Sequence, residues 1–205
     1  MQKTILTQFF SRSQFLIWGL AIFGMFSIQG NAYGQCATVS ASPSLMNGSF
    51  EEGANGLDNW TTMGVNPGLV GVESTNPNSG ANHFTFRHGS GEPQLFQSIP
   101  ASQGQLVSGS FEVFVNSPVT GNEFLSLQLL FRDGNNGVIQ PVTATNVNAS
   151  FPTGMYQTVS FNGIQAPAGT MSAQLFAIYL DNGPPGSDSM EVFLDDATLT
   201  SDASL

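Results

Sequence analysis

Apolar and polar residues alternate along most of the chain between residues 45 and 199. In one run, Leu125, Leu127, Leu129 and Phe131 share a face, with Ser126 and Gln128 opposite. Because successive side chains of a strand point to opposite faces, this pattern predicts strands that bury one side. No window shows the three- to four-residue spacing of an amphipathic helix. The sequence therefore predicts an all-β protein.

Segments rich in Gly, Asn and Pro separate these runs, for example residues 76–80, 133–137 and 182–186. With a segment near each end of the chain and the runs around 111–115 and 125–131 included, we count about ten or eleven strands. The other candidate strands are 58–64, 69–73, 82–88, 94–99, 138–147, 155–162 and 171–180. Their number and spacing favour a two-sheet antiparallel β-sandwich (jelly-roll) over a small barrel.

The first 34 residues have the pattern of an export signal. Lys3 and Arg12 precede an apolar stretch over residues 15–28, whose 14 residues are few for a membrane span. Small residues at the cleavage positions predict removal after Gly34, with a retained anchor as the alternative. We then expect a flexible segment over 35–44, a single sandwich domain over 45–200, a tail over 201–205, and a secreted or cell-surface protein.

Signal removal would leave Arg87 and Arg132 against 14 acidic residues, a net charge of −12 (2 − 14). This charge disfavours nucleic acid and anionic membrane surfaces as partners. Cys36 is the only cysteine, which rules out an intramolecular disulfide. A lipidated cysteine, a free thiol and an intermolecular disulfide all stay open.

Acidic residues lie next to apolar runs near both ends of the chain. Glu51 and Glu52 follow Phe50, and Asp195 and Asp196 follow Leu194. By alternation, Asp195 falls on the face of Phe193, Ala197 and Leu199, so its carboxylate would point inward and need a counter-charge. Calcium is suited to such ligands because it takes six to eight oxygens in a forgiving geometry. The alternative is an exposed, solvated acidic cluster.

Six short segments together resemble a known family. They are the Asn-Gly-Ser-Phe-Glu run at 47–51, the Gly-to-Trp run at 56–60, and residues 78–81, 104–105, 166–169 and 194–199. Their order and spacing, over roughly residues 45–200, resemble carbohydrate-binding modules of the family 4, 9 and 22 kind. The resemblance implies a galactose-binding-like jelly-roll whose first and last strands are neighbours, with Trp60 in the core.

The resemblance also implies a structural calcium ion (Ca2+) near one end of the sandwich. Its ligands would be the carboxylates of Glu51, Asp195 and Asp196, with carbonyl oxygens near Ser79 and Gly80 completing the shell. Calcium fits these groups chemically because all of them are oxygen donors.

A polysaccharide or glycan is the partner that the resemblance implies. Sugar sites combine aromatic faces with hydrogen-bonding side chains, and few Trp or Tyr residues follow the signal. The candidate ligand-binding residues are Arg87, His88, Gln128, Arg132 and Tyr156. The alternative is that Arg87 forms a structural ion pair and the histidines lie at the surface.

Catalytic motifs are missing from the sequence. No Gly-x-Ser-x-Gly elbow occurs, and Glu112 and Glu123, on strands that could be adjacent, are equally well explained as exposed acids. We therefore predict an exported, non-catalytic, glycan-binding module. The alternative is a structural or surface-layer subunit that packs against copies of itself, which the low charge fraction also suits.

Overall fold

The computed structural model describes residues 41–64, 68–89, 91–181 and 189–202. The expected signal sequence and Cys36 lie outside these residues. All of the described residues belong to one compact unit, residues 39–205. Within them, no helix has the length and apolar character needed to cross a membrane.

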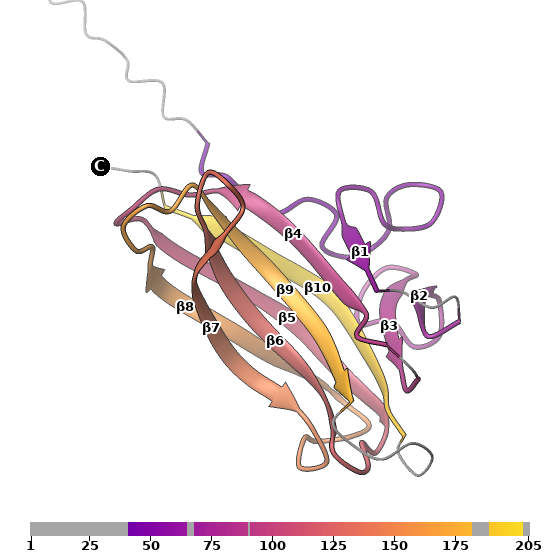
Figure 1. The fold of residues 1–205 in the computed structure, drawn as a ribbon. Helices are drawn as coiled ribbons and strands as arrows, with labels where there is room; N and C mark the ends of the chain where they lie inside the picture. The colour runs from indigo at the N-terminus through magenta and orange to yellow at the C-terminus, as the bar shows by residue number, and fades with distance from the viewer. Residues whose placement is uncertain (1–40, 65–67, 90, 182–188, 203–205) are drawn as a thin grey trace, which may run out of the picture. The chain divides into compact units, whose positions relative to one another are not determined.

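The described residues form ten strands in two antiparallel five-stranded sheets (Figure 1). The front sheet, nearest the viewer in Figure 1, has the order β1 (Thr61–Met63), β4 (Gln94–Pro100), β9 (Ser172–Asp181), β6 (Glu123–Arg132) and β7 (Val138–Val147). The back sheet has the order β2 (Val70–Glu73), β3 (His83–Arg87), β10 (Glu191–Ser201), β5 (Leu106–Ser117) and β8 (Tyr156–Gln165). The predicted all-β sandwich is confirmed.

The core lies between the two sheets and follows the predicted alternation. Leu125, Leu127, Leu129 and Phe131 of β6 are fully buried in it. Trp60 is 8% exposed and stacks on Phe50 with ring centroids 5.1 Å apart, which confirms its predicted place in the core. Each fully buried side chain of this size contributes roughly 1.5–3 kcal/mol through the hydrophobic effect.

The segment around residue 50 forms turns, so the prediction of a strand there was wrong. Asn47 and Phe50 have positive φ angles, 52° and 58°, which a strand does not accommodate. The preceding residues lie along the end of β10 instead: Leu45 N donates to Leu199 O at 2.8 Å, and Ala197 N donates to Gly48 O at 2.9 Å. The beginning of the domain and its last strand are therefore neighbours, although β1 itself pairs with β4.

An irregularity in β10 changes which side chains face the core. The pairing of β10 with β5 shifts register between Asp195 and Thr198, and Asp196 has a φ of 41°. Ala197 and Leu199 therefore point into the core, whereas Phe193 stacks on residues of the outer face of the back sheet. The prediction that Phe193, Ala197 and Leu199 share a face with Asp195 was wrong, because the bulge breaks the alternation. Ser201, expected in the tail, is the last residue of β10.

Candidate functional site

The loop between β2 and β3, residues 74–82, is held by carboxylates from both ends of the domain. Asp195 Oδ2 accepts hydrogen bonds from the backbone N–H groups of Asn78, at 2.7 Å, and Ser79, at 3.2 Å. Asp195 Oδ1 accepts one from Asp196 N at 2.7 Å. Asp195 has no exposed surface, so these three N–H groups take the place of solvent around its carboxylate.

Asp196 and Glu51 bind the same loop. Asp196 accepts from Ser79 Oγ at 2.6 Å and from Asn78 Nδ2 at 2.8 Å. Glu51 Oε1 accepts from the backbone N–H groups of Ala81 and Asn82, both at 2.7 Å. We call Glu51, Asp195 and Asp196 the acidic clasp. The structure thus brings together, on one loop, the four residues predicted to bind calcium, Ser79 included.

No cation offsets the charge of the acidic clasp within the described part of the chain. Burial is the main cause that raises the pKa of Asp195, to about 6, against the opposing effect of its backbone hydrogen bonds. Within the described residues, the hydrogen-bond partners of the three carboxylates are neutral N–H or O–H groups. Hard oxygen donors without a counter-charge suit calcium. However, no three Asp, Glu, His or Cys side chains among the described residues lie close enough to hold an ion, so main-chain oxygens would have to contribute.

Four rings form a row across the outer face of the back sheet, beside the acidic clasp. Phe193 lies 4.0 Å from His83 and 5.6 Å from Phe114, and Phe114 lies 5.2 Å from Tyr156, measured between ring centroids. Tyr156 Oη donates to Asn76 O at 3.0 Å. The structure therefore places Tyr156, a predicted ligand-binding residue, against the loop that crosses this face.

His83 is fully buried in this row, in contrast to the surface position considered for it. Neither of its ring nitrogens has a hydrogen-bond partner. Burial is the main cause that lowers the pKa of His83, because a buried imidazolium loses its hydration. The sequence contains no signal for this burial, which results from long-range folding of the loop over β3.

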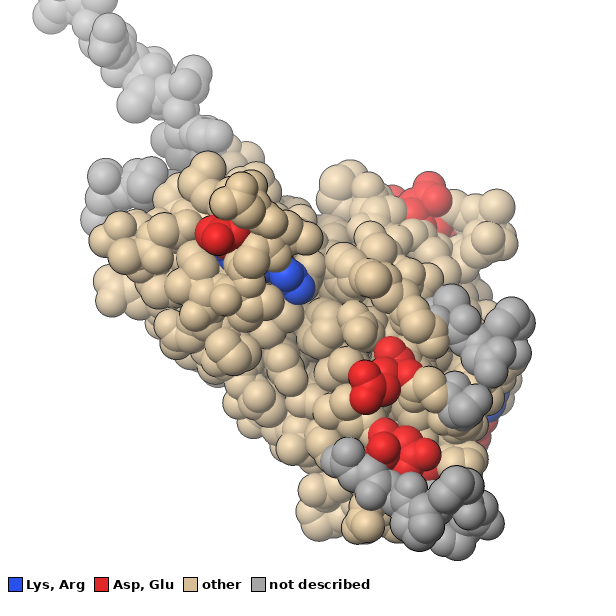
Figure 2. All heavy atoms as spheres, in the orientation of Figure 1, with Lys and Arg blue, Asp and Glu red and all other residues tan. Residues whose placement is uncertain are grey.

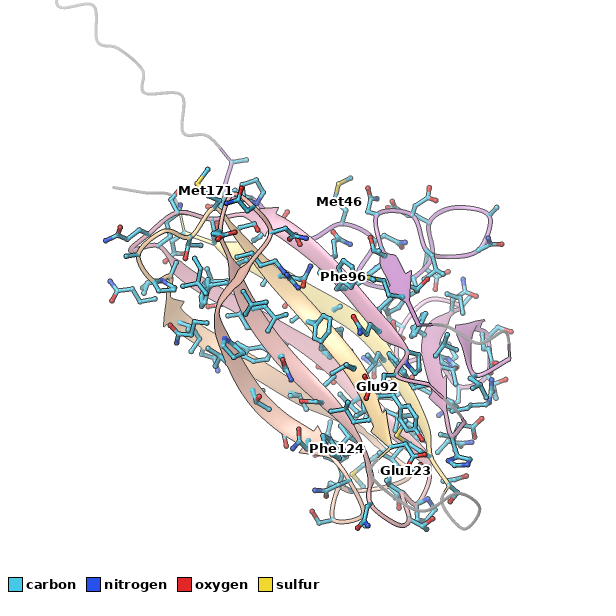
Figure 3. All side chains as sticks on the ribbon, viewed as in Figure 1. Met46, Glu92, Phe96, Glu123, Phe124 and Met171 are labelled. Atoms are coloured by element: carbon cyan, nitrogen blue, oxygen red, sulfur yellow. The ribbon has the colours of Figure 1, made fainter. Side chains whose placement is uncertain are left out.

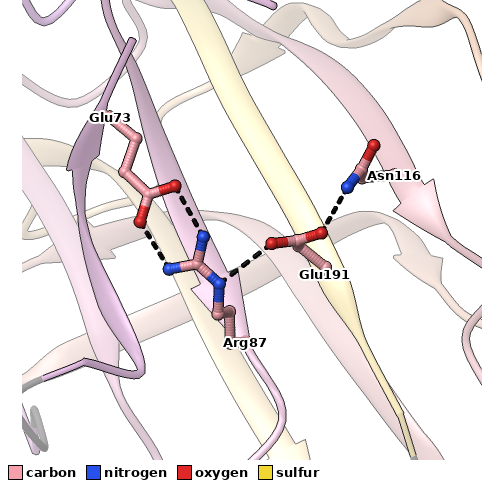
Figure 4. A network of polar contacts seen from close by, with 4 residues as sticks. All are labelled: Glu73, Arg87, Asn116 and Glu191. Atoms are coloured by element: carbon pink, nitrogen blue, oxygen red, sulfur yellow. Dashed lines mark hydrogen bonds and ion pairs between the residues drawn. The ribbon is translucent and has the colours of Figure 1, made fainter. Parts of the chain in front are cut away.

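Arg87 lies in a network of polar contacts on the same face (Figure 4). Its two terminal nitrogens donate to both carboxylate oxygens of Glu73, each at 2.5 Å, and its Nε donates to Glu191 at 2.9 Å. The Asn116 side chain contacts the other oxygen of Glu191. Hydrogen bonding to Glu73 is the main cause that raises the pKa of Arg87. This is the structural ion pair considered as the alternative for Arg87.

His88 lies at one end of the sandwich. Its Nδ1 contacts Glu123 Oε1, and Tyr179 Oη is 3.4 Å from the same nitrogen. Glu123 belongs to the front sheet, whereas Glu112 belongs to the back sheet, where it accepts a hydrogen bond from Thr158. These two acids therefore do not lie on adjacent strands, an arrangement that the sequence left open, since β5 and β6 belong to different sheets.

The outer face of the front sheet, which we call the front face, combines rings with amide side chains. Because the odd-numbered residues of β6 and β9 fill the core, the even-numbered ones point outward. Phe176 on β9 is paired with Gln128 on β6, and its ring centroid is 6.1 Å from that of Phe96 on β4. In Figure 1, no described segment crosses in front of the middle of β9 and β6. Figure 3 labels Phe96 and Phe124 on this side.

Arg132 ends β6 on the front face. Its Nε and Nη2 donate to Gln174 Oε1 at 2.9 and 2.7 Å, and its Nη1 donates to Asn136 O at 2.8 Å. Gln174 is only 2% exposed and donates in turn to Ser98 Oγ at 3.0 Å. Figure 2 shows a largely neutral surface on this side, with basic atoms beside one acidic group and further acidic groups away from them.

The five predicted ligand-binding residues do not form one site. Gln128 and Arg132 lie on the front face, Arg87 and Tyr156 lie on the outer face of the back sheet, and His88 lies at one end. The front face also contains the rings of Phe96 and Phe176, on the paired strands β4 and β9. Sequence reasoning missed these two residues, because the pattern along the chain does not indicate which strands become neighbours.

No protein-family model matches this chain, and no curated protein matches its sequence. Solved structures do match in fold. The enzymatically active domain of bacteriophage CBA120 tailspike protein 4 matches 78% of this chain with a TM-score of 0.56 and 14% identity; the match spans 21% of that longer chain.

Two carbohydrate-binding proteins also match. The TmCBM61 module, solved with beta-1,4-galactotriose, matches 76% of this chain and 95% of its own, with a TM-score of 0.50 and 17% identity. A structure of carbohydrate-binding modules of the beta-sandwich superfamily matches 77% of this chain and 62% of its own, with a TM-score of 0.53 and 14% identity. The chain therefore has the β-sandwich fold of these carbohydrate-binding modules, which confirms the resemblance found in the sequence.

Proposed function

We propose that this protein is a non-catalytic module that binds a polysaccharide on its front face. The observation that carries the proposal is the combination there of the partly exposed Phe96 ring, which packs beside Phe176, with the partly exposed amide of Gln128. Sugar rings offer an apolar face and a hydroxyl edge, which rings and amides match in turn. The fold shared with a module solved with beta-1,4-galactotriose supports the same proposal.

The front face is a better candidate than the outer face of the back sheet. On the back sheet, Arg87 is occupied by two glutamates, and Tyr156 donates to the loop that crosses the face. These groups already have protein partners, so a sugar would have to displace them. On the front face, Gln128 and Phe96 are partly exposed, and the partner of the Gln128 amide nitrogen is a neighbouring Ser126 hydroxyl.

Binding without catalysis is favoured by the positions of the acidic residues. Glycoside hydrolysis needs two carboxyl groups that face each other across the bound sugar. Glu112 and Glu123 lie on different sheets, and the acidic clasp is occupied by its own loop. The apolar stretch at residues 15–28 supports export as the setting of this function.

The test measures binding of the full chain to neutral polysaccharides. Galactan, xylan and cellulose oligosaccharides are titrated by calorimetry against the wild type, Phe96→Ala and Gln128→Ala. Loss of an aromatic contact should weaken binding about five- to tenfold. Thr158→Ala, on the outer face of the back sheet, is the control and should bind as the wild type does. Equal affinity in all variants, or loss only in the control, would contradict the front face as the site.

We also propose that the acidic clasp binds calcium. Because no three carboxylates of the described residues lie close enough to share one ion, calcium would be bound by at most two of Glu51, Asp195 and Asp196 at a time, and main-chain oxygens would complete the shell. Calcium would supply the counter-charge that these acids lack. Since a ligand that binds only the folded state stabilises it, calcium should raise the melting temperature and a chelator should lower it. Glu51→Gln should reduce this response and Glu52→Gln, whose side chain is expected in solvent, should retain it. Identical melting with calcium and with chelator would exclude the metal site.

Self-association is a second candidate function, favoured by the edge strands. Neither β7 nor β8 contains a charged residue, and charges are a common protection of edges against pairing with another chain. Sedimentation of the wild type over a range of concentrations tests this candidate. A concentration-dependent oligomer that Ser160→Lys abolishes would support it, and a monomer at every concentration would exclude it.

A further inference from the structure

Arg132 has N–H groups that no described residue of the chain uses as hydrogen-bond donors. A guanidinium carries five N–H groups, and the contacts of Arg132 to Gln174 and Asn136 occupy three of them. Two N–H groups remain, one on each terminal nitrogen. Two donors on neighbouring nitrogens match the two oxygens of a carboxylate.

The charge of Arg132 is also unmatched. Of the two arginines in the described residues, Arg87 pairs with two glutamates, whereas no carboxylate lies within ion-pair distance of Arg132 there. Asp133 is next in the chain, but its Oδ1 accepts from the backbone N–H groups of Asn135, at 2.9 Å, and Gly137, at 2.7 Å. Arg132 is therefore a partly buried cation without a counter-ion in an acidic protein.

The guanidinium is held in place before any ligand arrives. Gln174 accepts two of its N–H groups and is itself buried and bonded to Ser98. The Asn136 carbonyl, in the hairpin that follows β6, accepts a third. A side chain fixed in this way loses little conformational entropy when it binds, which favours affinity.

Arg132 is aligned with the proposed glycan-binding surface. It lies four residues beyond Gln128 on β6, which is about 13 Å along a strand. Gln128 is in turn paired with Phe176. A glycan chain lying along β6 would therefore contact the rings and amides in the middle of the front face and reach Arg132 at its end.

We propose that the front face selects a glycan carrying a carboxylate, a uronic acid residue, which binds the two free N–H groups of Arg132. This inference rests on the proposed function of the front face. The net charge of −10 disfavours a continuous polyanion. Repulsion of one carboxylate by distant acids is screened over about 8 Å at physiological salt, so a mainly neutral glycan with isolated uronic acids fits best.

The experiment compares oligosaccharides that differ only in the charge of the carboxyl group. Glucuronoxylan and partly esterified galacturonan oligosaccharides are arrayed as free acids and as methyl esters, together with their neutral counterparts. The wild-type chain should bind free acids about tenfold more tightly than the esters, because a charge-assisted bidentate contact is lost on esterification. Arg132→Gln should bind both forms equally. Arg132→Lys keeps the charge but loses the paired N–H donors of the guanidinium, so its preference for the free acid should be smaller than that of the wild type.

Each result decides a different point. The uronic acid inference is overturned if the wild type binds acids and esters equally, or if Arg132→Gln keeps the preference for acids. In either case, binding of the neutral glycans would still support the proposed function. A folded wild-type chain that binds no arrayed glycan overturns both. If Arg132→Gln does not fold, the wild-type ratio of acid to ester binding and the Arg132→Lys variant still decide the inference.

Discussion

The two outer faces of the sandwich differ in whether their charged groups are paired within the protein. On the back sheet, Arg87 pairs with two glutamates, and Asp195 accepts three backbone N–H groups. On the front face, Arg132 is bonded only to neutral groups and keeps two free donors. Both faces are built from strands of the same alternating pattern. The difference is whether each charged group is already satisfied by the protein.

This contrast separates structural from binding roles. A polar group whose partners are all supplied by the fold contributes to stability, and its removal leaves those partners unsatisfied. A group with free donors at a partly exposed surface contributes little to stability and is available to a ligand. Substitutions on the outer face of the back sheet should therefore change the free energy of unfolding, and substitutions on the front face should change binding.

The largest effect is expected for Asp195→Ala. It leaves the N–H groups of Asn78, Ser79 and Asp196 without their acceptor, next to a fully buried position. We expect the free energy of unfolding to fall by about 2–4 kcal/mol in urea denaturation. Asp195→Asn, which keeps one acceptor oxygen, should lose less. A loss below that of an ordinary surface substitution would show that the loop is held by other contacts.

The two arginines offer a matched pair. Arg87→Gln leaves Glu73 and Glu191 without their cation, and we expect a loss of about 1–2 kcal/mol in unfolding free energy. Arg132→Gln leaves no carboxylate without its cation, so its unfolding free energy should fall by less. Urea denaturation of both variants checks this order. Equal losses, or a larger loss for Arg132→Gln, would break the distinction between the faces.

The third prediction concerns pH. Folding lowers the pKa of His83. At a pH below the pKa of about 6.5 that histidine has in the unfolded chain, the unfolded chain binds more protons than the folded one, so stability falls as the pH is lowered. His83→Phe removes this term and keeps a ring to stack on Phe193. Its melting temperature relative to the wild type should therefore rise as the pH is lowered from 7 to 5.

The difference between the two melts isolates His83 from other titrating groups. The pKa of Asp195 is raised to about 6, so Asp195 acts in the opposite direction: the folded state binds more protons, and stability rises as the pH falls. Asp195 is present in both proteins and contributes to both curves. A difference in melting temperature that does not change with pH would mean that His83 titrates as it does in the unfolded chain.

The smallest effect on stability is expected for Gln128→Ala. The partner of its amide nitrogen is the Ser126 hydroxyl on the same strand, so we expect the unfolding free energy to change by no more than about 0.5 kcal/mol. Its affinity for a glycan should nevertheless fall, as measured in the same calorimetric titrations. A large loss of stability would place Gln128 among the structural residues.

Local patterns predicted most of the strands. The range 138–147 matches β7 at both ends, and the core positions of β6 follow simple alternation. These features depend on side-chain period alone. The bulge after Asp195 did not follow from the pattern, because the alternating apolar residues continue through it and only the pairing with β5 reveals the shift.

The candidate sites were predicted in part. Glu51, Asp195 and Asp196 all contact the loop that carries Ser79, but among the described residues no three acidic side chains lie close enough to hold one ion. The division of Arg87 and Arg132 between opposite faces was not predicted. It depends on strand order within each sheet, and neither composition nor spacing encodes which strands become neighbours.

Nuclear magnetic resonance mapping of the bound glycan tests the central claim most directly. Titration of the labelled chain with its tightest-binding oligosaccharide should shift the amide signals around Phe96, Gln128, Phe176 and Arg132, and leave those around His83 and Phe193 unchanged. Shifts concentrated on β3 and β10, with none on β4, β6 and β9, would contradict the front face as the binding surface.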